Sequence, residues 1–131
     1  MSNIIGLTVA TTSKECVVMS NQGTDCFLDL LIIASNVFEQ TENQEKMIVF
    51  LKDRRTINDI APGTAGFDLS DMPWQEETLK DDVNFLLRVT AAAQSESIFK
   101  KLPYKANGEI VIPWLKQFAM LIEQIITDSE L

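Results

Sequence analysis

The sequence contains no histidine among its 131 residues. Histidine is the side chain that most often performs general acid–base catalysis near neutral pH, and it is the commonest metal ligand. Catalytic triads of serine, histidine and aspartate and cysteine–histidine pairs are therefore excluded. A Gly-Lys-Ser/Thr motif is also missing after the glycine-rich residues 63–66 (GTAG), which argues against a phosphate-binding loop. We expect a protein that is not an enzyme and that needs no cofactor.

Paired carboxylates are the remaining candidates for catalysis. Asp68 with Asp71, or Asp81 with Asp82, would suit acid–base chemistry or a Mg²⁺-dependent hydrolase. Adjacent acids on a helix point to different sides, however, and acids at a helix start are ordinary. We therefore expect no metal site and no catalytic residues.

Cysteines and long apolar runs are also scarce. Cys16 and Cys26 lack metal-ligand spacing, and we expect two buried, reduced thiols, with a disulfide or redox switch as the alternative. The most apolar run, residues 26–34 (CFLDLLIIA), contains Asp29 and is nine residues long, whereas a membrane-spanning helix needs about 20. No secretory signal pattern opens the chain. These absences predict a cytoplasmic protein without a membrane partner.

The composition is that of a globular domain, with 46% apolar and 23% charged residues. The length suits one domain, so we treat residues 1–131 as a single unit. The net charge is −8, and −6 of it falls within residues 57–83, where seven acids accompany Lys80 alone. Phosphate is repelled by such a surface, and no basic stripe with interleaved aromatic residues exists. We expect no binding of nucleic acid.

Apolar residues recur at helical spacing in two segments of the amino-terminal half. The segment that begins at Thr24 is apolar nearly all round, which predicts a helix in the centre of the core. Thr41 and Gln44 form a capping box that predicts the start of a second helix. We expect this helix to end near Arg54 and Arg55, because cations complement a helix carboxyl end. Binding of phosphate or a carboxylate by these arginines is the alternative.

Two further helices are predicted in the carboxyl-terminal half. The third covers about residues 75–94, and Pro73 suits its first turn. Residues 95–108 read as an irregular connection with one short helical turn around Phe99. Pro113 fits the first turn of the last helix better than its interior, so residues 110–112 are expected to be extended.

The amino terminus has strand character. Residues 4–10 and 15–20 are short and β-branched around a polar TTSK, which fits either a β-hairpin or one strand plus a loop. The predicted fold is mainly α, a compact bundle of about four helices. A hairpin would make it α+β at the margin.

The acidic segment supplies the candidate binding site. A local acidic patch mimics phosphate for a basic partner and speeds association, and aromatic residues dominate interface hot spots. The acidic residues could instead form the solvated start of a helix, where acids are ordinary. Trp74 could instead pack the loop against the rest of the protein. The candidate partner-binding residues are Asp68, Asp71, Trp74, Glu77 and Asp81.

Three runs carry a resemblance: GFDLSDMPW (residues 66–74), FLLRV (85–89) and LPYKANGEIVIPWLKQFAMLI (102–122). Together they resemble small bacterial immunity proteins that accompany polymorphic toxins of the contact-dependent growth inhibition type. The resemblance covers about the carboxyl-terminal half. It implies a cytosolic protein that neutralises the carboxyl-terminal toxin domain of a cognate effector, and many such toxins are nucleases. The alternative is an acidic regulatory adaptor or subunit of a cytosolic protein assembly.

Overall fold

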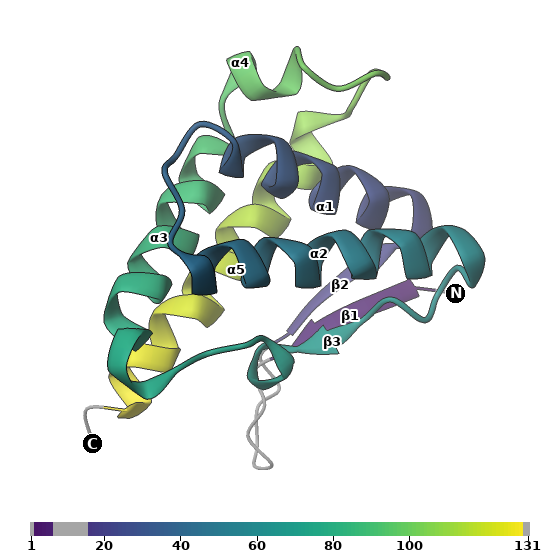
Figure 1. The fold of residues 1–131 in the computed structure, drawn as a ribbon. Helices are drawn as coiled ribbons and strands as arrows, with labels where there is room; N and C mark the ends of the chain where they lie inside the picture. Colours follow the sequence, from purple (N-terminus) through teal and green to yellow (C-terminus); the bar gives the residue numbers. More distant parts are fainter. Residues whose placement is uncertain (1, 7–15, 130–131) are drawn as a thin grey trace.

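The computed structural model describes residues 2–6 and 16–129. Helices dominate these residues, so the predicted mainly α fold is confirmed (Figure 1). Two short 3-10 turns, η1 (Leu69–Asp71) and η2 (Glu76–Thr78), lie between the last strand and the third helix. The strands and α-helices are, in order, β1 (Ser2–Gly6), β2 (Cys16–Ser20), α1 (Asn21–Ser35), α2 (Glu42–Ile60), β3 (Phe67–Asp68), α3 (Leu79–Ala92), α4 (Glu96–Phe99) and α5 (Gly108–Ser129).

The three strands form one small sheet in the order β2-β1-β3. β1 and β2 are antiparallel, with Ser2 opposite Ser20 and Gly6 opposite Cys16. The pairing of a hairpin is therefore confirmed, although residues 7–15 lie outside the described residues. β3 runs parallel to β1, a pairing that the sequence did not predict.

Alternation along β2 separates the core from the solvent. Val17 and Met19 are buried against the helices, whereas Cys16, Val18 and Ser20 are exposed. Our expectation of two buried thiols is thus wrong for Cys16 and confirmed for Cys26, and both thiols are free. The period of two that places Val17 inward necessarily turns its neighbour Cys16 outward.

α1 lies at the centre of the fold, as its apolar sequence predicts. It packs against α2, α3, α4, α5 and the sheet (Figure 1). Phe27 of α1 meets Phe118 of α5 edge to face, with ring centroids 5.2 Å apart. Its fully buried apolar side chains are Phe27, Leu28, Leu30, Leu31 and Ala34.

Two predicted helix boundaries are wrong around α2 and α3. α2 does not end near Arg54 and Arg55 but continues to Ile60. Contacts with α1 explain the difference. Arg55 pairs with acids of α1, and Asn58 donates hydrogen bonds to α1, so α1 stabilises the last turns of α2. α3 begins at Leu79 and not near residue 75, which leaves Pro73 in the preceding loop.

The start of α5 also differs from the prediction. Residues 110–112 are helical, and Pro113 lies inside the helix. Asn107 initiates the helix earlier: its Oδ1 accepts a hydrogen bond from the amide of Glu109 at 3.0 Å, and its carbonyl oxygen accepts those of Ile110 and Val111. Pro113 removes one helical hydrogen bond, and the buried apolar face of α5, with Val111, Leu115 and Phe118, offsets that loss.

The remaining expectation for this half is confirmed, since α4 is the short helical turn predicted around Phe99. Within the described ranges, no helix is long and apolar enough to cross a membrane.

Candidate partner-binding groove

Two of the seven acids in residues 57–83 have structural roles. Asp82 is only 1% exposed and accepts hydrogen bonds from Asn43 Nδ2 at 2.7 Å, Gln44 Nε2 at 3.2 Å and Thr78 Oγ1 at 2.7 Å. Asp59 pairs with Arg55 one helical turn away. Asp82 is therefore unavailable to a partner, and the charge of Asp59, whose side chain is 62% exposed, is neutralised by Arg55.

The other five acids lie on the surface. We call them the exposed acids: Asp68, Asp71, Glu76, Glu77 and Asp81. The carboxylate of Asp71 accepts a hydrogen bond from the amide of Asp68 at 3.1 Å. In the part of the chain that the structure describes, no ion pair joins any of the five to a cation.

The exposed acids follow one connecting segment and do not meet at a point. Asp68 belongs to β3, Asp71 to η1, Glu77 to η2 and Asp81 to the first turn of α3. Figure 1 shows this segment crossing from the sheet toward the carboxyl-terminal end of α5. The acids thus form an extended acidic edge.

Trp74 anchors this segment to the body of the protein. Its indole Nε1 donates a hydrogen bond to the carbonyl oxygen of Leu69 at 2.7 Å, and its half-buried ring packs against the core. The interpretation of Trp74 as a loop-packing residue is confirmed. Contact between its exposed part and a partner stays a prediction.

A groove of about 660 Å³ lies between the α1–α2 connection and α3. One wall is formed by residues 37–41 together with Gln44, and the other by Asp81, Asn84 and Arg88. The three α3 residues are spaced i, i+3 and i+7, so they form one strip along the helix surface. Asp81 is the one candidate residue among those that line this groove.

The α3 strip separates opposite charges. Asp81 and Arg88 are seven residues apart, which places them about 10.5 Å apart along the helix axis. Asp81, Asn84 and Arg88 are all exposed, and none of their side chains makes a hydrogen bond or ion pair within residues 2–6 and 16–129. The strip therefore offers an acid, an amide and a guanidinium to a binding partner.

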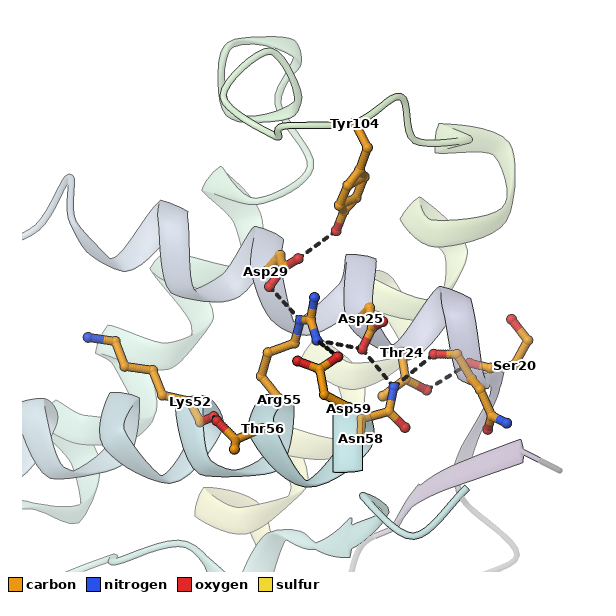
Figure 2. Close-up of polar contacts among 11 residues, drawn as sticks. Ser20, Thr24, Asp25, Asp29, Lys52, Arg55, Thr56, Asn58, Asp59 and Tyr104 are labelled. Carbon is orange, nitrogen blue, oxygen red and sulfur yellow. Dashed lines mark hydrogen bonds and ion pairs between the residues drawn. The ribbon is translucent and has the colours of Figure 1, made fainter. Parts of the chain in front are cut away.

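A second polar cluster joins α1, α2 and the connection before α5 (Figure 2). Arg55 of α2 donates from Nε to Oδ1 of Asp29 at 2.8 Å, and its Nη1 lies 2.9 Å from Oδ1 of Asp25. Tyr104 Oη donates to the other oxygen of Asp29 at 2.6 Å. We call these residues, with Asp59, the Arg55 cluster.

The Arg55 cluster was missed by the sequence analysis, which expected Arg55 at a helix end. The structure favours the alternative that it binds a carboxylate, and the carboxylates belong to its own chain. A signal was present, since Asp25 and Asp29 interrupt an apolar helix at a spacing of four residues. The sequence contains nothing that identifies their partners.

The electrostatics of the cluster follow from burial and proximity. Burial lowers the pKa of Arg55, but hydrogen bonds to Asp29 and Asp59 and the nearby carboxylate charges outweigh it and raise that pKa. Burial and the bond to Asp29 raise the pKa of Tyr104. Burial, reinforced by the charge of Asp29, also raises the pKa of Cys26 to about 11. The cluster is therefore a structural tie in which Arg55 stays charged and Tyr104 stays protonated.

Neither a metal site nor a known relative adds to the description of the groove or of the Arg55 cluster. Across the described residues, no group of three or more cysteine, aspartate or glutamate side chains is placed to hold a metal ion. Searches against protein-family models, curated proteins and solved structures found no match.

Proposed function

We propose that this chain is a bacterial immunity protein, which binds a cognate toxin domain in the cytosol and neutralises it without catalysing a reaction. The observation that carries the proposal is the set of five exposed acids, none of which pairs with a cation of the described chain. Like charges along one segment repel one another and destabilise the compact state. A basic partner would relieve that repulsion.

The chemistry of the edge indicates the kind of partner. Carboxylates spread over one segment suit the basic, phosphate-binding face of a nuclease, and their field speeds association with such a face. The run GFDLSDMPW, which carries part of the resemblance to immunity proteins, includes Asp68, Asp71 and Trp74. Surface charge and resemblance therefore point to the same segment.

Growth rescue tests the proposal. The carboxyl-terminal domain encoded by the gene immediately upstream is induced in a test strain, with and without this protein. We expect toxicity that the wild-type protein abolishes. A variant with Asp68→Lys and Asp81→Lys should lose the rescue, because it reverses two charges of the acidic edge.

A control variant with the same change in net charge separates the effect of the acidic edge from that of total charge. Asp53 on α2 and Glu109 on α5 are exposed and lie outside the acidic edge. Asp53→Lys with Glu109→Lys should retain the rescue. Absence of toxicity, or toxicity that persists with the wild-type protein, would overturn the proposal and favour a regulatory adaptor.

A further inference from the structure

We infer that the groove between residues 37–41 and α3 fixes the position of the partner, by receiving a segment in which a basic side chain faces Asp81 and an acidic side chain faces Arg88. The inference rests on the proposed function. It adds Asn84 and Arg88, which an acidic edge alone does not use.

The polar strip of α3 is unpaired within the described chain and belongs to a firmly packed helix. Asp81, Asn84 and Arg88 lie on the exposed side of α3, and none of them has a polar partner in the described chain. The opposite side of the same helix is fully buried through Val83, Leu86 and Val89. Because the buried side holds α3 in place, the strip keeps a fixed spacing of charges before any partner arrives.

The opposite wall of the groove, residues 37–41, is preformed. Val37 is 58% exposed and Phe38 is half-buried, so this wall adds some apolar surface to the groove. The wall is held in place because Gln40 Nε2 donates a hydrogen bond to the carbonyl oxygen of Ser35 at 2.8 Å, and the capping box of α2 follows directly. Such preorganisation lowers the entropy lost on binding.

The pattern of charge in the groove selects among possible occupants. Asp81 and Glu39 disfavour a simple anion such as phosphate, and Arg88 disfavours a simple cation. A protein segment that carries both signs, about 10 Å apart, complements the strip at both ends.

Charge reversal at Arg88 separates this inference from general attraction to an acidic surface. Arg88→Glu makes the protein more negative, so attraction of a basic toxin to overall negative charge would tighten binding. Docking in the groove instead predicts weaker binding, because a partner carboxylate would then face a glutamate. We expect the dissociation constant of the complex with the toxin domain encoded by the upstream gene to rise about 10-fold or more.

Calorimetry with the purified toxin domain and the full chain measures these constants. Asp81→Lys should also weaken binding, whereas Lys116→Glu, the same charge change on the exposed side of α5, should leave the dissociation constant within about 3-fold of wild type. Arg88→Gln removes the charge without reversing it and replaces Arg88→Glu if that variant does not fold.

The outcomes separate the two proposals. Weaker binding by both Asp81→Lys and the Arg88 variant, with Lys116→Glu unchanged, supports the groove. Unchanged or tighter binding by the Arg88 variant overturns the groove inference, while the proposed immunity function stands. Failure of the wild-type protein to bind the toxin domain overturns both.

Discussion

Arg55 on α2 donates a hydrogen bond from Nε to Oδ1 of Asp29 on α1 across 2.8 Å. The second oxygen of Asp29 accepts a hydrogen bond from Tyr104, which lies in the connection between α4 and α5. One carboxylate therefore ties together three segments that are far apart in the sequence (Figure 2). The stability of this tie depends on Arg55, because it is the only cation that the structure shows pairing with Asp25, Asp29 or Asp59.

Removal of that cation should destabilise the fold. In Arg55→Met, the carboxylates of Asp25 and Asp29 lose their counter-charge in a site where the Arg55 side chain is only 25% exposed. We expect the free energy of unfolding to fall by about 2–3 kcal/mol, as measured by urea denaturation.

The matched control is Lys46→Met. Lys46 pairs with Glu42 at 4.0 Å on an open surface, with side-chain exposures of 58% and 88%. Its loss should change stability by less than about 0.5 kcal/mol. Equal effects of the two substitutions would show that solvent screens the Arg55 cluster as it does an ordinary surface pair.

Tyr104 provides a direct test of the same cluster, because it is the single tyrosine in the sequence. Phenolate absorbance as a function of pH therefore reports Tyr104 alone. Burial and the hydrogen bond to Asp29 raise its pKa, so the midpoint in the native protein should lie above 10 and return to about 10 in urea.

The raised pKa of Tyr104 makes the stability of the fold depend on pH. The folded state holds the Tyr104 proton more tightly than the unfolded state, so this contribution is fully present below about pH 10 and is lost as the pH rises further. Asp29→Asn should lower the native midpoint toward 10. A native midpoint that is the same as the one in urea would contradict the hydrogen bond between Tyr104 and Asp29.

Local patterns in the sequence predicted local structure well. The capping box at Thr41 and Gln44 is present atom for atom, with Thr41 Oγ1 accepting from the amide of Gln44 and Gln44 Oε1 accepting from the amide of Thr41. The apolar periodicity of α1 likewise identified the central helix. Both signals depend on neighbours within one turn, which a sequence displays directly.

Features that depend on distant residues were not predictable. The extension of α2 beyond Arg55 depends on acids 26 or more residues earlier in the chain. The groove combines residues 37–41 with a strip of α3, so only Asp81 was identified, through its charge, and Arg88 was not. The two-residue β3 is too short to show any periodicity.

Asp81 and Asp82 illustrate the same limit and yield a third prediction. Nothing in the sequence distinguishes these adjacent aspartates. In the structure, Asp82 is buried with three hydrogen-bond donors around it, whereas Asp81 is exposed. Asp82→Ala should lower the free energy of unfolding by about 3 kcal/mol, because buried donors of Asn43 and Gln44 lose their acceptor. Asp81→Ala should change it by less than about 0.5 kcal/mol.

Urea denaturation of the two variants under identical conditions gives both values. The comparison is well matched, because both substitutions remove one aspartate from the first turn of α3. A loss for Asp81→Ala as large as that for Asp82→Ala would point to a general effect of charge at the helix start, and not to the buried network.

The contact between Gly23 and Trp114 makes a last prediction possible. A Cβ atom at Gly23 in α1 would overlap the indole ring of Trp114 in α5, whereas a Cβ at Gly108 would lie 3.5 Å from its nearest neighbours. Alanine is a better helix former than glycine by about 1 kcal/mol, so propensity alone favours both substitutions. At Gly23, displacement of the ring should outweigh that gain.

We therefore expect Gly23→Ala to lower the free energy of unfolding by about 1–3 kcal/mol, and Gly108→Ala to leave it unchanged or raise it by up to about 1 kcal/mol. Urea denaturation followed by circular dichroism measures both without relying on the fluorescence of Trp114. Stabilisation by Gly23→Ala would instead show that the half-buried ring of Trp114 can move aside at little cost.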